Sequence, residues 1–303
     1  MVDRGQAANH IPGRSVAALP GHCTHHHGSI TYPGTSFWLM LRQVFNIFLP
    51  HLAMSLPTCR IKIINSNTCQ AMTDNINATA QSIRFPNTEI VTVQPQRGPE
   101  SVESFYDEYL AIPGILEQII LDHDSDAFIV ACWGDPGIEA AREITTKPVI
   151  GISEASLYVA NMLAAKWSVV TTLHRVRDMV EKTIVKTGLT ERCASVRTTK
   201  LSVLETEQDR ATTLDVLTEA SQLAIQADGA EAICLGCAGM SGLEQELENR
   251  LGVPVIDAVA AAVKMAESLV SLGKTTSKQL TYRSPERKEI KGYPSHYQAE
   301  NFS

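Results

Sequence analysis

From residue 59 onward, short apolar runs alternate with longer segments whose apolar residues recur at helical spacing. Apolar runs that end in small polar residues are typical of buried parallel strands. The pattern predicts strands at 60–64, 89–93, 126–131, 148–152, 166–172, 195–204, 232–235 and 253–257. It predicts helices at 73–84, 101–122 with a break or kink at Pro113-Gly114, 154–163, 175–186, 207–227, 258–272 and one that begins at Pro136. Strands that alternate with helices predict an α/β fold built on parallel sheets.

The second half of this pattern repeats the first. A buried strand that runs into a cysteine and a glycine-containing turn occurs at 126–137 and again at 231–241. Ile64 precedes Cys132 by 68 residues, and Val170 precedes Cys237 by 67. Such duplication predicts two pseudo-symmetric parallel-sheet lobes with the active site in the cleft between them. We expect a first lobe of 59–164 and 257–292, a second lobe of 165–256, a poorly ordered leader at 1–58 and a tail at 293–303.

Composition narrows the class of partner. The formal charge of −7 argues against non-specific nucleic-acid binding, and no window of 18 uncharged apolar residues favours a membrane span. Seven cysteines without dense regular spacing do not form a secreted disulfide scaffold, so we expect free thiols and a cytoplasmic location. We therefore expect a small-molecule substrate and neither a nucleic acid nor a membrane as partner.

The leader differs from the rest of the chain. It carries Cys23 with His22, His25, His26 and His27, which raises the possibility of a metal site, but the spacing matches no zinc template. Its apolar stretch at 37–50 is too short to span a membrane and is interrupted by polar residues. We therefore interpret the leader as dispensable and expect no metal.

Cys132 and Cys237 are the candidate catalytic residues. Asp135 stands at a natural helix N-cap with Pro136 at the first helical position, so a strand delivers Cys132 to a helix N-terminus. A thiol placed there is expected to have a pKa below its usual value of about 8.5. Facing lobes would place the two thiols on opposite faces of one substrate. That geometry suits inversion of an acidic C–H stereocentre, with one thiolate removing the proton and the other thiol returning one.

Further residues at strand ends are the candidate substrate-binding set. Main-chain N–H groups after each cysteine are expected to hold the developing enolate oxygen. The set comprises Asn67, Thr68, Trp133, Gly134, Thr171, Thr172, Gly236, Ala238 and Gly239. The alternative for Asn67 and Thr68, and for Thr171 and Thr172, is that they only cap the helices that follow them. Cys234 and Cys237 form a Cys-x-x-Cys that could be a redox or metal half-site, but Cys234 lies inside an apolar strand and is interpreted as core.

Over residues 59–292 the chain resembles the hydantoin and allantoin racemase branch of the aspartate/glutamate racemase superfamily. The motifs that carry the resemblance are Asn65-Ser-Asn-Thr68, Gly98-Pro99, 131–137, 148–154, 169–172 and 235–240. The resemblance implies that Cys132 and Cys237 are the acid/base pair, that no cofactor is used and that the protein is a homo-oligomer. Trp133 stands where many relatives have Phe, which is expected to alter the shape of the pocket.

The two residues directly after each cysteine predict the class of substrate. In amino-acid racemases of the superfamily an Asn-Thr pair commonly follows the cysteine and grips an α-carboxylate, whereas Trp133-Gly134 and Ala238-Gly239 offer no such donors. A 5-substituted hydantoin or allantoin, whose C5–H lies beside a carbonyl, is the better match. Two alternatives stay open: an Asp/Glu-type racemase or related isomerase, and a non-catalytic small-molecule binding protein.

Overall fold

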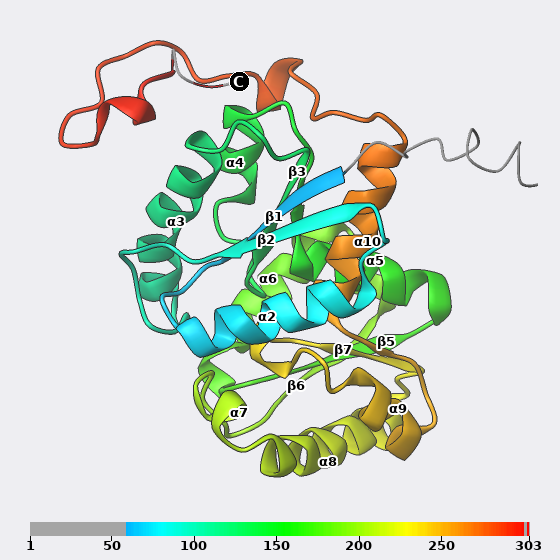
Figure 1. The fold of residues 1–303 in the computed structure, drawn as a ribbon. Coiled ribbons are helices and arrows are strands. Elements are labelled where there is room, and N and C mark those ends of the chain that lie inside the picture. The colour runs from blue at the N-terminus through cyan, green and yellow to red at the C-terminus, as the bar shows by residue number, and fades with distance from the viewer. Residues whose placement is uncertain (1–58, 300–301, 303) are drawn as a thin grey trace, which may run out of the picture. The chain divides into compact units, whose positions relative to one another are not determined.

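The computed structural model describes residues 59–299 and 302, all within one compact unit, Ser55–Ser303. Four parallel strands form the first sheet in the order β2-β1-β3-β4, with bounds β1 Cys59–Asn65, β2 Thr88–Val93, β3 Ala127–Ala131 and β4 Val149–Gly151. The second sheet has the order β6-β5-β7-β8, with bounds β5 Trp167–Thr171, β6 Cys193–Thr198, β7 Ala232–Leu235 and β8 Val255–Ile256. The equal order of the strands confirms the predicted duplication and the α/β class (Figure 1).

Helices connect consecutive strands and cover the sheets. Their bounds are α2 Gln70–Ile83, α3 Phe105–Ile120, α4 Ile138–Ile144, α5 Ile152–Leu163, α6 Arg177–Thr187, α7 Glu205–Gln208, α8 Arg210–Asp228, α9 Glu244–Leu251 and α10 Ala258–Ser271. The last of these, α10, returns from the second sheet and contacts β1, β3, β4, α2 and α5 (Figure 1). Helix α5 contacts β4 on one side and β7, β8 and α6 on the other, so it joins the two lobes.

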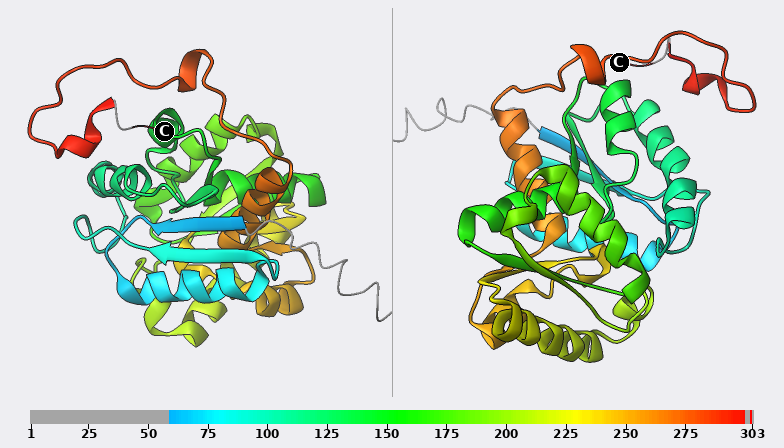
Figure 2. Two further views of the ribbon diagram at one scale, coloured as in Figure 1. Left: turned by 45° about the horizontal axis from the view of Figure 1, so that its top comes forward. Right: turned by 180° about the vertical axis from the view of Figure 1, so that it is seen from behind.

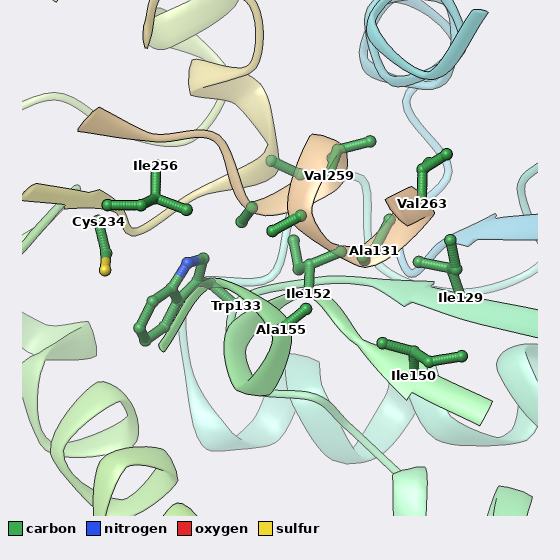
Figure 3. Close-up of a cluster of buried hydrophobic side chains, with 14 of the residues drawn as sticks. Ile129, Ala131, Trp133, Ile150, Ile152, Ala155, Cys234, Ile256, Val259 and Val263 are labelled. Carbon is green, nitrogen blue, oxygen red and sulfur yellow. The ribbon is translucent and has the colours of Figure 1, made fainter. Parts of the chain in front are cut away.

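The strands are apolar throughout because both faces of each sheet are covered. In β1, Ile61 and Ile63 point into the largest core cluster, while Ile64 points into a second cluster on the other face. The largest cluster includes residues of both sheets, such as Ile129 of β3 and Cys234 of β7, together with Val259 of α10 (Figure 3). One continuous core therefore holds the two lobes together.

Helix α3 runs through Pro113 without the predicted break. Ser104 caps its N-terminus by accepting a hydrogen bond from the Asp107 N–H, at 3.2 Å. Gly114 serves close packing, because a Cβ built there would lie 2.6 Å from Cβ of Pro95. Packing against the loop after β2 explains the glycine, and this pair does not break the helix.

Three further element boundaries differ from the prediction. The segment predicted as one helix at 207–227 is two helices, because Asp209 leaves the helical conformation and caps α8 through the N–H groups of Ala211 and Thr212. Strand β6 ends at Thr198 rather than at residue 204. Helix α4 begins at Ile138, after a left-handed Gly137, and not at Pro136.

The C-terminal segment runs over the first lobe (Figure 2). The Thr276 N–H donates to the Thr146 carbonyl at 2.8 Å, and the Tyr297 hydroxyl donates to the Pro113 carbonyl at 2.6 Å. Within the described ranges, no helix is long and apolar enough to cross a membrane. The predicted leader and the Cys23 metal alternative lie outside the described residues.

Candidate active site

The two candidate thiols occupy equivalent places in the two lobes. Cys132 directly follows β3, and Cys237 lies two residues after β7, the strand in the same position of the second sheet. Both side chains are partly exposed and line one pocket at the carboxyl ends of the strands. The lining comprises Asn67, Met72, Val102, Ala131, Cys132, Trp133, Gly134, Thr171, Thr172, Val176, Met179, Val180, Val203, Gly236, Cys237 and Ala238. Residues of both lobes thus form the pocket, as predicted for the cleft.

Asp135 fixes the loop that carries Cys132. Its N–H donates to the Cys132 carbonyl at 3.0 Å, and its backbone has a φ of 49°. The carboxylate accepts from the N–H and the hydroxyl of Ser153, at 3.0 and 2.9 Å, and from the Glu154 N–H at 3.0 Å. Asp135 therefore caps α5, one strand further along the chain. The prediction that it caps a helix beginning at Pro136 was wrong.

Asp257 fixes the Cys237 loop in the way that Asp135 fixes the Cys132 loop. One carboxylate oxygen accepts from the Gly242 N–H at 2.8 Å, and the other accepts from the Ala260 N–H at 2.9 Å, at the start of α10. Ser241 also donates its hydroxyl to Asp257, at 3.4 Å. Each thiol loop is consequently tied to the helix that follows the next strand of its sheet.

Burial sets the ionisation of both thiols. Desolvation raises the pKa of Cys132 well above its usual range and raises the pKa of Cys237 to about 12. The N–H groups of Gly134 and Gly239 donate to the two sulfurs and lower these pKa values, but by less than burial raises them. The expectation of a lowered pKa was therefore wrong, because burial outweighs the main-chain donors, even at Cys237, which directly precedes the short 3-10 helix Ala238–Met240.

A thiolate on one cysteine disfavours a thiolate on the other. Cys237 raises the pKa of Cys132, second only to burial, as expected for two groups that acquire like charges in one pocket. The site therefore favours a state with one thiolate and one thiol over a state with two thiolates. One base and one acid in the same pocket are what a two-base proton transfer requires.

Asn67 and Thr171 line the pocket, but their side chains also form internal hydrogen bonds. The side-chain oxygen of Asn67 accepts a hydrogen bond from the Cys69 N–H at 2.9 Å. The side-chain amide nitrogen of Asn67 donates to the Met72 sulfur at 3.1 Å. The Thr171 hydroxyl donates to the Gly236 carbonyl at 2.8 Å, which fixes the end of β5 against the second thiol loop. These contacts shape the loops at the strand ends.

The remaining predicted binding residues divide into two groups. Gly134, Thr172, Gly236 and Ala238 lie in the lining. Thr68 and Gly239 fall outside the lining of this described pocket. Thr68 instead donates its N–H and its hydroxyl to the Pro99 carbonyl, at 3.0 and 3.3 Å, and Gly239 donates its N–H to the Cys237 sulfur. Both act on the loops of the site.

Trp133 belongs mainly to the core. Its side chain is 6% exposed and packs in the same cluster as Cys234 and Ile256 (Figure 3). Cys234 is fully buried and lies 3.9 Å from the Ser156 carbonyl, so its thiol does not share the environment of Cys237. Among the residues that the structure describes, no three His, Cys, Asp or Glu side chains gather as metal ligands would.

The apolar wall of the pocket was not predicted. Met72 comes from the helix after β1 and Met179 from the helix after β5, and each reaches the thiol loop of the opposite lobe. A Cβ built at Gly239 would lie 3.3 Å from the Met72 methyl, and one built at Gly134 would lie 4.0 Å from the Met179 methyl. The only signal in the sequence was that both methionines occupy the first turns after equivalent strands.

Comparisons with known proteins show the family of the chain. A family model described as Asp/Glu/Hydantoin racemase matches residues 61–266. The chain belongs to this family. Within it, the chain is 51% identical to the hydantoin racemase of Pseudomonas sp. (strain NS671), covering 77% of this chain and 94% of the relative. It is an isomerase of the racemase type.

Solved structures of the family have the same fold. The allantoin racemase from Klebsiella pneumoniae superposes with a TM-score of 0.76 at 42% identity, covering 80% of this chain and 98% of that one. The allantoin racemase from Pseudomonas fluorescens gives 0.75 at 42% identity, with 77% and 100% covered. These likenesses establish the family fold of this racemase, with two parallel-sheet lobes.

Proposed function

We propose that this racemase inverts the C5 stereocentre of 5-substituted hydantoins or allantoin by proton transfer between Cys132 and Cys237. The observation that carries the proposal is the placement of two thiols, at equivalent strand ends, in one pocket. The chain's similarity to a hydantoin racemase and to allantoin racemases supports the substrate class.

In the proposed reaction one cysteine reacts as the thiolate and the other as the thiol. The thiolate takes the C5 proton, and the electron pair of the broken C–H bond moves into the ring carbonyl to give an enolate. The opposite thiol then delivers its proton to the other face of C5 and is left as the thiolate. The reverse reaction exchanges the two roles.

Different main-chain N–H groups of the two thiol loops stabilise the thiolate and the enolate oxygen. Because Gly134 and Gly239 donate their N–H groups to the sulfurs, they stabilise whichever cysteine is the thiolate. This differs from the sequence prediction, which assigned these two groups to the enolate oxygen. The N–H groups of Trp133 and Ala238, directly after each thiol, are the candidates that remain for that oxygen.

The pocket favours an apolar 5-substituent over the ureido group of allantoin. Six methionine and valine side chains from both lobes form much of its wall: Met72, Val102, Val176, Met179, Val180 and Val203. Asn67 and Thr171 direct hydrogen-bonding groups at the protein itself. Each ureido N–H or carbonyl left unpaired in such a pocket costs about 1–3 kcal/mol. We therefore propose 5-alkyl hydantoins as the preferred substrates.

Polarimetry with enantiopure substrates tests the proposal. Loss of optical rotation from 5-alkyl hydantoins, faster than from allantoin and absent without enzyme, is the expected result. Racemisation of free aspartate or glutamate with none of any hydantoin would instead favour the amino-acid racemase alternative. Ligand-induced thermal stabilisation without any change in rotation would favour a binding protein.

The cellular setting and assembly are also proposals. The six cysteines among the described residues are all free, which fits a reducing cytoplasm. Large apolar side chains such as Tyr106 and Tyr109 are exposed on α3, which fits a homo-oligomer. Light scattering on the purified protein measures the number of subunits directly.

A further inference from the structure

A glutamate carboxylate lies behind each thiol loop, at the glycine whose N–H donates to the sulfur. A Cβ built at Gly134 would lie 3.4 Å from Oε1 of Glu108, and one built at Gly239 would lie 3.3 Å from Oε1 of Glu207. Both glycines are the second residue after their cysteine. The same juxtaposition thus occurs once in each lobe.

The two glutamates come from equivalent elements. Glu108 belongs to α3, the helix after β2, and Glu207 belongs to α7, the helix after β6. Strands β2 and β6 hold the same edge position in the two sheets. The correspondence of the glutamates therefore follows the duplication that relates Cys132 to Cys237. In each lobe, the carboxylate beside the glycine comes from a separate helix and not from the thiol loop itself.

Glu108 is half-buried and faces groups from two other helices. Lys182 and Lys186 of α6 lie near it, together with Glu139 of α4. The two lysines form their ion pairs elsewhere, Lys182 with Asp178 at 2.8 Å and Lys186 with Glu139 at 3.3 Å. Within residues 59–299 and 302, Glu108 itself has no ion pair. Burial raises its pKa.

Glu207 is also half-buried and lies between the lobes. Asn75 of α2 donates to it at 3.2 Å, and Arg210 lies near it while donating to the Ser241 carbonyl. Burial raises the pKa of Glu207 as well. A third carboxylate, that of Glu103, accepts the Val203 N–H at 2.8 Å and also faces Cys237. The described part of the chain shows no ion pair for Glu207.

Each glutamate acts on the thiol of its own lobe. Glu108 raises the pKa of Cys132, after burial and Cys237, and Asp135 adds a smaller effect in the same direction. Glu207 raises the pKa of Cys237, with Glu103 as the smaller contributor. A carboxylate near a thiol disfavours the thiolate by like-charge repulsion. Glu108 lies at the Cys132 loop and Glu207 at the Cys237 loop, so each glutamate acts on a different thiol.

We propose that Glu108 and Glu207 are a matched pair of positioning residues, each controlling how readily the thiol of its own lobe releases its proton. Neither is assigned contact with the substrate. The catalytic use of this control rests on the proposed function, because the two-thiol reaction needs one cysteine to keep its proton while the other has lost it. The control of thiol ionisation itself does not rest on substrate turnover.

Alkylation measures this control without any substrate. Cys132 is monitored in a Cys237→Ser background, and Cys237 in a Cys132→Ser background, by peptide mass spectrometry of iodoacetamide labelling over a range of pH. Glu108→Gln is expected to shift the Cys132 profile by about half a pH unit to lower pH, which gives about threefold faster labelling below the midpoint. It is expected to leave the Cys237 profile in place. Glu207→Gln is expected to give the opposite pattern.

Two further variants keep the result specific. Glu108→Asp retains the charge and is expected to restore most of the wild-type profile, while Glu219→Gln removes an exposed charge on α8 and is expected to change neither thiol. Unchanged profiles in both glutamine variants, or equal shifts at both thiols, would overturn the proposal. A failure of the two-thiol reaction would show separately, as absent racemisation with normal alkylation profiles.

Discussion

Asp135 and Ser153 join the Cys132 loop to the start of α5 through two hydrogen bonds to one carboxylate oxygen, at 3.0 and 2.9 Å. Both residues are buried, and α5 is a helix that contacts both lobes. The Cys132 loop is thereby tied to an element that contacts both lobes. In the second lobe, Asp257 ties Gly242 to α10 in the same manner.

Asp135→Ala is expected to lower both stability and activity. It removes the acceptor for Ser153 and for the Glu154 N–H, leaving buried donors unsatisfied, and should cost roughly 2–3 kcal/mol of unfolding free energy. Urea titration measures the stability, and racemisation rates measure the loss of activity. Asp135→Asn keeps one oxygen for Ser153 and is expected to lose less. Full activity in the alanine variant would show that the loop does not need this tie.

The same carboxyl predicts a dependence of stability on pH. Burial, and then the charge of Glu154, raise the pKa of Asp135 to about 7. The folded state therefore holds this proton where the unfolded chain, with an ordinary Asp pKa of about 3.9, has released it. Its contribution to stability should be fully present below about pH 4 and lost as the pH rises to about 7. Urea midpoints at several pH values should show a smaller loss over that window in Asp135→Asn than in wild type.

Gly151→Ala is expected to be strongly destabilising for a steric reason. A Cβ at this position would lie 2.1 Å from Cγ of Asp135, within a buried loop that cannot move aside. The loss should exceed about 2 kcal/mol in urea unfolding. In an Asp135→Ala background the same substitution should cost much less, because the opposing carboxylate is gone. Equal costs in the two backgrounds would contradict the contact.

Racemisation should become faster as the pH rises. Since burial raises the pKa of both thiols, to about 12 for Cys237, only a small fraction carries the thiolate near neutral pH. Between pH 7 and 9, kcat/KM is expected to increase about tenfold per pH unit. Initial rates with one enantiopure hydantoin in constant-ionic-strength buffers provide the measurement. A profile that is flat over this range would contradict the raised values, because it would require a thiol whose pKa lies below about 7.

Removal of residues 2–53 is expected to leave racemisation intact. The family match begins at residue 61, and the pocket is lined by residues 67–238. The comparison is made between the full chain and the shortened chain in kcat/KM and in thermal midpoint. Complete loss of activity in a folded shortened chain would contradict the interpretation of the leader as dispensable.

The sequence allowed the fold and the thiol pair to be predicted because both depend on local, repeated patterns. Strand β3 and strand β7 are apolar throughout, and the spacing to their cysteines is nearly equal in the two halves. Parallel strands then place their carboxyl ends at one edge. The thiols were therefore predictable, as were pocket positions such as Thr172 and Gly236.

The features that could not be predicted depend on contacts between distant segments. The sequence offered Asp135 a helix to cap next to it, beginning at Pro136. In the structure its carboxylate instead accepts from Ser153, 18 residues further along the chain, at the N-terminus of α5. The pKa of Cys132 depends on its burial in the folded protein, which outweighs its local main-chain donor, the Gly134 N–H. Met72 and Met179 each cross to the other lobe, so no local pattern reveals their place in the pocket.

Deuterium exchange at C5 tests the two-thiol mechanism most directly. Each enantiomer of a 5-alkyl hydantoin is incubated in deuterated water with Cys132→Ser or Cys237→Ser, and NMR monitors loss of the C5 proton while polarimetry monitors rotation. Each variant is expected to lose racemisation by at least about 100-fold yet exchange the proton of one enantiomer, with opposite preference in the two variants. Near-wild-type racemisation in either variant, or the same preference in both, would contradict a mechanism in which Cys132 and Cys237 act on opposite faces.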